Sequence, residues 1–260
     1  NLEKLITMLS NISGISDLTM TTNAYLLPQK AQALKDAGLN RITVSLDTLD
    51  DEIFRKMNGR SCGIDKVIEG IDAAREVGFD PIKVNSVVQR NVNDHTLIEL
   101  ADYCRKNNII LRFIEYMDVG NRNGWLMDQV VPSSEIISLL NSEFHLEPLE
   151  PNYSSEVARR FRYQDGSGEI GVISSVTAPF CGNCTRMRLS PEGTLYTCLF
   201  GSDGKDLRKP MREGLDDQAI KSLIERTWKS RKDRYSDERT SLTEFDRKTR
   251  RKVEMYHIGG

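Results

Sequence analysis

Three cysteines in the C-terminal half of the chain have the spacing of a metal centre. Cys181 and Cys184 form a Cys-x-x-Cys pair, and Cys198 follows fourteen positions later. Two thiolates on a tight Gly-Asn turn can bind one metal centre, and a third thiolate from a second short strand adds another ligand. The pattern therefore predicts a site with three soft ligands.

Two arginines follow the cysteine pair directly. Arg186 and Arg188 are two positions apart, and residues two apart on a strand point to the same side. Guanidinium groups bind anions, often through two parallel hydrogen bonds. We therefore predict a soft metal beside an anionic ligand.

The spacing alone leaves an iron-sulfur cluster, a structural zinc ion and a redox-active dithiol open. A thioredoxin-like dithiol opens a helix after a strand, whereas this pair precedes a predicted strand. Structural zinc usually has four ligands, and none of His95, His145 and His257 lies near the cysteines in the sequence. Five scattered cysteines without a secretory signal disfavour disulfides.

The composition is that of a globular protein. Of 260 residues, 38% are hydrophobic and 28% are charged, and the net charge is −2. This balance favours neither a membrane nor a nucleic-acid role. The chain starts at Asn1, within a predicted amphipathic helix and without an initiator methionine. We therefore expect an N-terminally truncated protein, located in the cytoplasm.

Strands and helices alternate through residues 1–117. Apolar residues recur at helical spacing in 64–71 and 97–104. Repeated βα units predict a parallel sheet with right-handed crossovers, either open or closed as a barrel. The predicted strands are short, rich in β-branched residues and bounded by turn signals; they are 17–22, 41–46, 82–87 and 109–114.

A ligand of such a sheet lies at the C-terminal ends of the strands. Most polar residues there also serve as caps or turn formers, and Met117 suits a core equally well. Lys83 and Asn85 differ, because they fall in an otherwise apolar strand where a lysine needs a partner or a ligand. The rule selects Thr21, Thr22, Asn23, Ser45, Asp47, Lys83, Asn85, Arg112, Glu115 and Met117.

The second half of the chain does not continue the alternation of strands and helices. A polar loop over 118–132 and a helix over 134–141 precede four short alternating segments, which predict antiparallel strands in a separate C-terminal region. The turn at 191–193 brings Cys198 back beside Cys184. The four segments are 157–163, 169–173, 187–189 and 194–199.

Several motifs together resemble one known family. They are Phe180–Arg188, Cys198–Gly201, Leu207–Arg208 and the final Gly259–Gly260, with Thr21–Asn23, Val44–Leu49, Lys83–Asn85 and Leu111–Asp118 upstream. This combination covers nearly the whole chain. It is similar to the GTP 3′,8-cyclase family, the radical S-adenosylmethionine (SAM) enzymes of molybdenum cofactor biosynthesis.

The resemblance implies an α/β fold. Residues 1–117 would form an incomplete βα TIM-like barrel of parallel strands, the family's strands 3 to 6. Residues 118–260 would form a mixed α+β region that holds an auxiliary 4Fe-4S cluster through Cys181, Cys184 and Cys198. With three thiolates, one iron stays open for the guanine of GTP.

The resemblance also implies roles for individual residues. Ser45 and Met117 match SAM-binding positions, and Gly259 and Gly260 match a tail that reaches toward the active site. The arginines suit a triphosphate by charge and fork geometry. The positions that match GTP-binding residues are Thr21, Lys83, Arg112, Arg186, Met187 and Arg188.

The implied activity is that of a lyase. A 5′-deoxyadenosyl radical from SAM converts GTP to 3′,8-cyclo-7,8-dihydro-GTP, the first step of molybdenum cofactor biosynthesis. An electron donor would act before this enzyme and cyclic pyranopterin monophosphate synthase after it. A homodimer is compatible with the sequence.

One departure limits the resemblance. The family's first cluster needs a Cys-x-x-x-Cys-x-x-Cys motif, and only Cys62 and Cys104 remain besides the three cysteines already placed. We therefore expect the SAM-cleaving cluster only in a full-length parent, and no SAM cleavage by this segment alone. Two alternatives stay open, a zinc-stabilised non-catalytic binding module and a radical SAM enzyme with another substrate, such as a peptide.

Overall fold

The structure is a computed structural model that describes the whole chain except residues 60–61, 243–245, 247–251 and 259–260. The chain divides into two compact units. The first comprises Asn1–Tyr116, Asp128–Asn152 and Glu156–Ser174, and the second comprises Met117–Met127, Tyr153–Ser155 and Ser175–Gly260.

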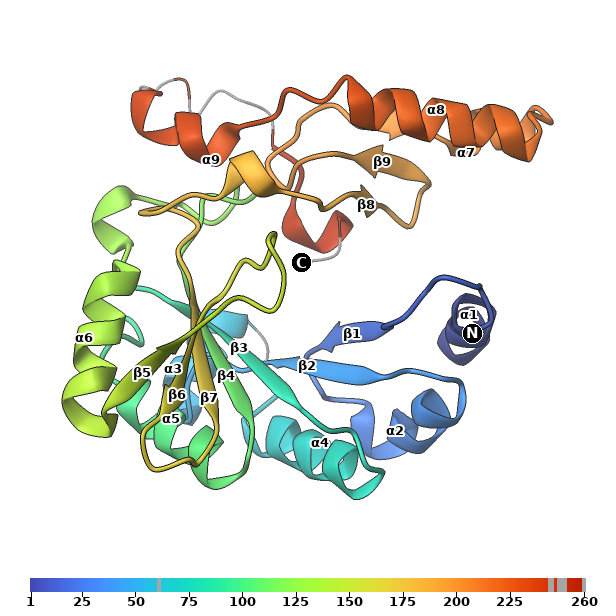
Figure 1. The fold of residues 1–260 in the computed structure, drawn as a ribbon. Helices are drawn as coiled ribbons and strands as arrows, with labels where there is room; N and C mark the ends of the chain where they lie inside the picture. The colour runs from blue at the N-terminus through green and yellow to red at the C-terminus, as the bar shows by residue number, and fades with distance from the viewer. Residues whose placement is uncertain (60–61, 243–245, 247–251, 259–260) are drawn as a thin grey trace. The chain divides into compact units, whose positions relative to one another are not determined.

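The first unit is built on a seven-stranded sheet with the order β1-β2-β3-β4-β7-β6-β5 (Figure 1). Neighbouring strands from β1 to β7 in this order pair in parallel, whereas β6 is antiparallel to both β7 and β5. The sheet is open, with β1 and β5 at its edges, as the predicted incomplete barrel requires. The strands are β1 (Thr19–Thr22), β2 (Arg41–Ser45), β3 (Lys83–Val88), β4 (Ile110–Glu115), β5 (Leu146–Leu149), β6 (Arg159–Tyr163) and β7 (Glu169–Ile173).

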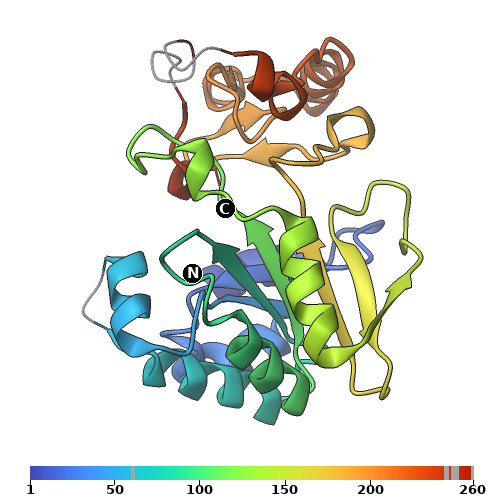
Figure 2. The ribbon, with the colours of Figure 1, turned by 90° about the vertical axis from the view of Figure 1, so that its left-hand side faces the viewer.

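Helices pack on the outer face of this sheet (Figures 1 and 2). Local signals set their ends: in α3, Asp50 accepts a hydrogen bond from the Ile53 N–H at 2.9 Å, and Gly59 ends the helix with φ of 62°. The helices are α1 (Leu2–Ser10), α2 (Leu27–Asp36), α3 (Asp51–Asn58), α4 (Asp65–Glu76), α5 (Leu97–Lys106) and α6 (Ser133–Phe144).

The two faces of the sheet differ in burial. Along β3 and β4, every second residue is fully buried against the helices, such as Val84 and Leu111. The residues between them, which include Lys83 and Arg112, are half-buried on the other face. The period-2 pattern thus places Lys83, Asn85 and Arg112 on this half-buried face, whereas Glu115 lies on the buried face with the helices.

The predicted boundary at residue 117 marks only the first of several crossings between the units. The chain returns to the first unit for 128–152 and 156–174, which the sequence analysis assigned to the C-terminal region. There β7 pairs in parallel with β4, and β6 pairs with β7. The expectation that these strands form a separate layer is wrong. Pairing with β4 covers backbone groups that would otherwise form an exposed sheet edge.

The second unit contains a small three-stranded sheet with the order β10-β9-β8. The predicted hairpin is confirmed: β8 (Arg188–Leu189) pairs antiparallel with β9 (Thr194–Tyr196), and Gly193 in the turn has φ of 85°. The other elements are β10 (Lys205–Asp206), α7 (Arg208–Arg212), α8 (Asp217–Lys229) and α9 (Tyr235–Glu238).

A buried ionic network centres on Asp118 in the second unit. Its carboxylate accepts hydrogen bonds from Arg239 Nε at 2.8 Å, from Lys252 Nζ at 2.8 Å and from the Tyr235 hydroxyl. Phe200 stacks on Tyr235, with ring centroids 4.7 Å apart. The network joins the loop after β4 to α9 and to the chain near its C-terminal end.

Candidate functional site

The three predicted ligand cysteines lie in the second unit around the β8–β9 hairpin. Cys181 begins the 3₁₀ turn Cys181–Asn183, Cys184 follows it, and Cys198 follows β9. All three thiols are half-buried and free. Both Cys184 and Cys198 lie close enough to the Arg188 guanidinium to affect its pKa, so the hairpin brings the two cysteine segments together.

The environment of Cys198 opposes a charged thiolate in the metal-free protein. Burial raises the pKa of its thiol, and the nearby Asp233 carboxylate and Cys181 thiol add to the rise. The Phe200 N–H, which points at Cys198 Sγ from 3.4 Å, and the Arg188 guanidinium act in the opposite direction. A metal centre would supply the missing positive charge.

The two predicted arginines lie beside these thiols. Burial lowers the pKa of Arg188, and the neighbouring Arg186 guanidinium lowers it further. Arg186 stacks on the Phe180 ring at 5.1 Å, and Met187 between them is half-buried. Two adjacent guanidinium groups beside three thiols form a locally cationic surface that suits an anionic ligand.

The arrangement of the three thiols can be compared with what a metal centre requires. Among the described residues, no group of three or more His, Cys, Asp or Glu side chains is gathered as one metal ion requires. In a four-iron cluster each thiolate binds a different iron, so the sulfurs lie further apart than around one zinc ion. The three thiols are free and half-buried, and they lie around one hairpin.

Two further residues contact the cysteine segments and were not predicted. Arg231 Nη1 donates a hydrogen bond to the Cys184 carbonyl oxygen at 2.7 Å. Asp233 accepts one from the Thr197 hydroxyl, next to Cys198. Both lie in the charged stretch after α8, where nothing in the local pattern distinguishes them from a solvated surface.

Four predicted ligand residues lie on the same face of the first unit's sheet, where Lys83 and Arg112 are half-buried and Thr21 and Ser45 are exposed. Strand register aligns Thr21 with Thr43 and Lys83, and it aligns Ser45 with Asn85 and Arg112 two residues further along the strands. The prediction that all of these residues lie at the C-terminal ends of their strands is wrong for two of them. Lys83 begins β3 and Arg112 lies inside β4, so neither is at a C-terminal end.

Asn85 lies between Ser45 and Arg112 in this register. Its side-chain oxygen is buried, and no hydrogen-bond partner for it is found in the described part of the chain. Buried polar atoms in native proteins almost always have a partner, which includes bound ligands and water. The sheet face thus contains an acceptor that a ligand can satisfy.

A cavity of about 190 Å³ opens beside Lys83 and Arg112. Arg160 and Glu169 also line it and form an ion pair, with Nη2 to Oε2 at 2.8 Å. Glu156 is a second acidic residue at the cavity, with a side chain only 4% exposed and 3.9 Å from Arg160 Nη1. The cavity has room for several water molecules or a phosphate group.

Lys83 is electrostatically strained in this cavity. Burial lowers its pKa to about 8, and the Arg112 and Arg41 guanidinium groups contribute to the shift. Glu156 and Asp17 only partly offset it. A cationic group held among other cations favours the binding of an anion.

Other polar residues at the strand ends have structural partners. Glu115 is fully buried and accepts hydrogen bonds from the Ser133 N–H and hydroxyl, both at 2.8 Å, at the start of α6. Asp47 accepts one from the Val87 N–H at 2.8 Å. Met117 packs against the second unit's buried cluster of Val119, Phe200 and Tyr235.

Two predictions about residues outside these groups remain, one for Cys104 and one for the two C-terminal glycines. Cys104 is fully buried in the core, and burial raises the pKa of its thiol well above the usual range. Gly259 and Gly260, the predicted tail, lie outside the described residues.

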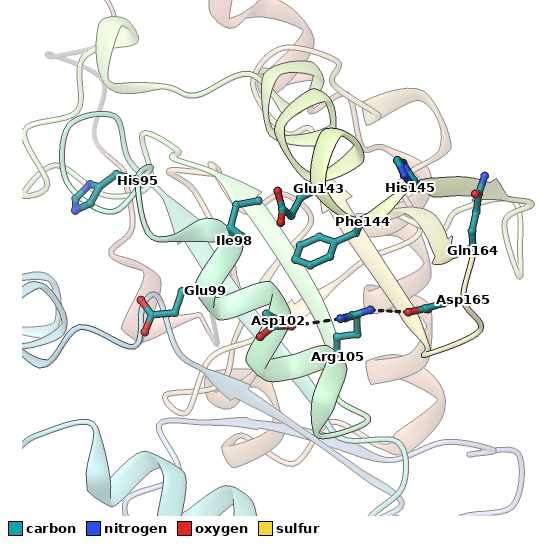
Figure 3. A pocket seen from close by; sticks show the side chains of 10 residues that line it. All are labelled: His95, Ile98, Glu99, Asp102, Arg105, Glu143, Phe144, His145, Gln164 and Asp165. Atoms are coloured by element: carbon teal, nitrogen blue, oxygen red, sulfur yellow. Dashed lines mark hydrogen bonds and ion pairs between the residues drawn. The ribbon is translucent and has the colours of Figure 1, made fainter.

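Another cavity lies elsewhere on the first unit. It measures about 890 Å³ and contains none of the predicted ligand residues (Figure 3). Arg105 pairs there with Asp102 and Asp165, and its guanidinium stacks over Phe144 at 5.3 Å. These contacts tie the β6–β7 turn to α5, so this surface has a structural explanation.

Two family models match the chain. The Radical SAM superfamily matches residues 1–104, and Molybdenum Cofactor Synthesis C matches residues 109–237. The second match contains Cys181, Cys184 and Cys198, the three predicted ligands, and both Arg186 and Arg188.

Curated relatives match the chain over its whole length. An enzyme of Acidothermus cellulolyticus is 46% identical over 281 residues, which cover 100% of this chain and 78% of the relative. Enzymes of Xanthomonas campestris pv. campestris and Staphylococcus carnosus are each 46% identical, with 75% and 76% of their length covered. All three are named GTP 3′,8-cyclase. This chain belongs to the GTP 3′,8-cyclase family.

Membership in the GTP 3′,8-cyclase family agrees with the fold. The Radical SAM match contains β1 to β3 of the sheet, whereas the Molybdenum Cofactor Synthesis C match contains β4 to β7 of the same sheet and the cysteine-bearing part of the second unit. Among solved structures, the radical SAM enzyme coproporphyrinogen III oxidase from Escherichia coli is similar over 68% of this chain, at 12% identity and a TM-score of 0.41. Every helix among the described residues is too short or too polar to span a membrane.

Proposed function

We propose that this protein functions in the radical SAM cyclisation of GTP to 3′,8-cyclo-7,8-dihydro-GTP, the first step of molybdenum cofactor biosynthesis. The observation that carries the proposal is the set of three free thiols beside Arg186 and Arg188. It occurs in a chain that aligns over its full length with enzymes named GTP 3′,8-cyclase.

In this proposal Cys181, Cys184 and Cys198 hold the auxiliary 4Fe-4S cluster. When bound, a four-iron cluster with three thiolate ligands offers one open iron to the guanine base of GTP. The protein contributes position: the β8–β9 hairpin fixes the cysteine segments relative to each other, and Arg188 offsets negative charge on two of the thiolates.

The triphosphate and the ribose need cationic and polar groups, which both units supply. Arg186 and Arg188 bind phosphate oxygens in the second unit, with Met187 between them. In the first unit, Thr21, Lys83 and Arg112 contact GTP, and Ser45 contacts SAM, as does Met117 of the second unit. The cationic cavity at Lys83 and the unsatisfied Asn85 oxygen support ligand binding on this sheet face.

The proposal extends to partners. An electron donor reduces the SAM-cleaving cluster, and cyclic pyranopterin monophosphate synthase consumes the product, in the cytoplasm where thiols stay reduced. The Gly259–Gly260 tail extends toward the reacting groups. A homodimer fits this scheme.

We further propose that the 260-residue chain alone does not cleave SAM. Its sequence contains no Cys-x-x-x-Cys-x-x-Cys motif, so the reducing cluster has no ligands. Incubation of the reconstituted protein with SAM and dithionite should yield no 5′-deoxyadenosine by liquid chromatography. Formation of this product at stoichiometric or higher yield would overturn the statement.

Metal content and GTP binding test the main proposal together. After anaerobic reconstitution, the wild type should contain about four irons per chain and bind GTP, and Cys198→Ser should lose most of both. Cys62→Ser, which removes a cysteine at no proposed ligand position, is the matched control and should behave as the wild type. Zinc in place of iron, with GTP binding indifferent to Cys198, would instead establish the zinc-stabilised binding module.

A further inference from the structure

The segment 231–233, directly after α8, contacts both cysteine-bearing segments. Its first contact is the hydrogen bond from Arg231 Nη1 to the Cys184 carbonyl oxygen, at 2.7 Å. The Arg231 guanidinium also lies over the Trp228 ring, 4.9 Å from its centroid. Stacking on the last turn of α8 restricts the long arginine side chain, so the hydrogen bond fixes Cys184 relative to a rigid helix.

The second contact comes from Asp233. Its carboxylate accepts a hydrogen bond from the hydroxyl of Thr197, the residue before Cys198. It also lies close enough to Cys198 to affect the pKa of that thiol. One three-residue segment therefore contacts the Cys181–Cys184 turn with a cation and the Cys198 segment with an anion.

These contacts border a cleft of about 290 Å³. Cys181 and Cys184 line it together with Trp228, Arg231 and Asp233. Arg234 lines the same cleft, but its side chain is 62% exposed and pairs with Asp237 at 2.8 Å. Arg231 thus differs from its neighbouring arginine in contacting the cysteine turn.

We infer that Arg231 and Asp233 are positioning residues of the three-cysteine centre, which hold its two cysteine segments in register and set the charge around the cluster. This inference rests on the proposed function, because it requires that an iron-sulfur cluster binds there. Residues outside the ligand set commonly orient ligands and tune metal centres in this way.

The opposite charges of the two residues give the inference a specific signature. Reduction adds negative charge to a cluster, and a nearby cation stabilises the reduced state whereas a nearby anion destabilises it. Loss of the Arg231 charge should therefore lower the reduction potential of the cluster, and loss of the Asp233 charge should raise it. A merely structural role predicts no such opposition of sign.

The experiment compares four variants of the reconstituted chain with the wild type. Arg231→Gln and Asp233→Asn remove the charges while keeping similar shape, and Arg231→Lys restores the positive charge. Arg234→Gln removes an equal charge from the same cleft and is the control. Iron content, the visible absorption of the cluster and its reduction potential by electron paramagnetic resonance titration are measured for each.

We expect Arg231→Gln to bind roughly half the iron of the wild type or less, because loss of one outer hydrogen bond commonly costs about tenfold or more in metal affinity. Its remaining cluster should have a lower potential, Asp233→Asn a higher one, and Arg231→Lys and Arg234→Gln values near the wild type. If Arg231→Gln fails to fold, the inference can still be tested by comparing the reduction potential of Asp233→Asn with that of Arg234→Gln. A higher potential in Asp233→Asn supports the inference, and equal potentials overturn it.

Equal iron content and equal potentials in all variants would overturn the inference while leaving the cluster itself intact. Shifts of the same sign in Arg231→Gln and Asp233→Asn would also overturn it. A wild type that binds no iron would be a different failure, because it removes the proposed function on which the inference rests.

Discussion

At the scale of single residues, Lys83 links charge to ligand binding. Burial and two neighbouring arginines lower its pKa to about 8, so the side chain is charged below pH 8 and neutral above it. If it binds a phosphate oxygen of GTP, binding should weaken as the pH rises from 7 to 9. Lys83→Met should bind roughly ten- to a hundredfold more weakly at pH 7, with a flatter pH profile in calorimetric titrations.

The matched comparison for Lys83 is Lys35, which lies on α2 and stacks on Phe79 away from the cavity. Lys35→Met should leave both affinity and pH profile unchanged. Equal profiles for the wild type and Lys83→Met would contradict the role of Lys83.

Glu156 should oppose anion binding at the same cavity. Its nearly buried carboxylate lies among Lys83 and Arg160, in a position that an incoming phosphate group would have to share. Glu156→Gln removes the negative charge with little change in shape, so tripolyphosphate and GTP should bind more tightly, by a few-fold or more. Unchanged or weaker binding would show that the carboxylate has only a structural role.

The raised pKa of Asp47 makes the free energy of unfolding depend on pH. Burial raises its pKa to about 6, against the hydrogen bond from Val87 that favours the carboxylate. The folded state therefore binds this proton more tightly than the unfolded state, and the stabilisation by the neutral form is lost as the pH rises from about 4 to 6. Part of the Asp47 residue is exposed, so the loss is at most about 3 kcal/mol.

Asp47→Asn retains an oxygen that can accept from Val87 and removes the titration. Its free energy of unfolding in urea, followed by circular dichroism, should fall less between pH 4 and 7 than that of the wild type. Parallel pH curves for the two proteins would contradict this account of Asp47.

At the scale of elements, the Asp118 network holds distant parts of the second unit together. Arg239 is fully buried and the Lys252 side chain is 5% exposed, and both bond to the same carboxylate. Asp118→Asn would leave two buried cations without their counter-charge, which should cost about 3–5 kcal/mol.

Tryptophan fluorescence can test the Asp118 prediction in this unit alone. Both tryptophans of the chain, Trp125 and Trp228, belong to the second unit. The urea midpoint of Asp118→Asn should therefore fall strongly by fluorescence, whereas the exposed Asp203→Asn should stay within about 0.5 kcal/mol of the wild type. Coincident curves for both variants would refute the network's importance.

The sequence predicts local elements better than the pairing between them. The strands at 41–46 and 109–114 and the 191–193 hairpin follow from β-branched runs and turn residues close in the chain. The pairing of β7 with β4 was missed, because more than fifty residues separate them and alternating apolar residues do not specify a partner strand.

The same limit applies to the site. Cys181, Cys184 and Cys198 could be found because ligand spacing is local. Arg231 contacts Cys184 across 47 positions, and no pattern in a charged stretch indicates which arginine folds back. Lys83 was selected as a candidate because a charged residue in an apolar strand is costly to bury without a partner.

At the scale of the whole molecule, the residues proposed to bind GTP and SAM belong to both units. Thr21, Ser45, Lys83 and Arg112 belong to the first, whereas Met117, Arg186 and Arg188 belong to the second. The two family matches together cover residues 1–104 and 109–237, and the boundary between them falls within the first unit. The GTP 3′,8-cyclase family therefore accounts for the chain as a whole, although the sequence alone placed β6 and β7 in the wrong part.

The central claim is that a cluster on Cys181, Cys184 and Cys198 is the binding site of GTP. The most direct test is an electron paramagnetic resonance titration of the reduced, reconstituted chain with GTP, and with ATP as the control nucleotide. The account predicts a spectrum that changes with GTP and saturates near one nucleotide per cluster, with little change for ATP. A cluster spectrum that stays unchanged while GTP binds would contradict it.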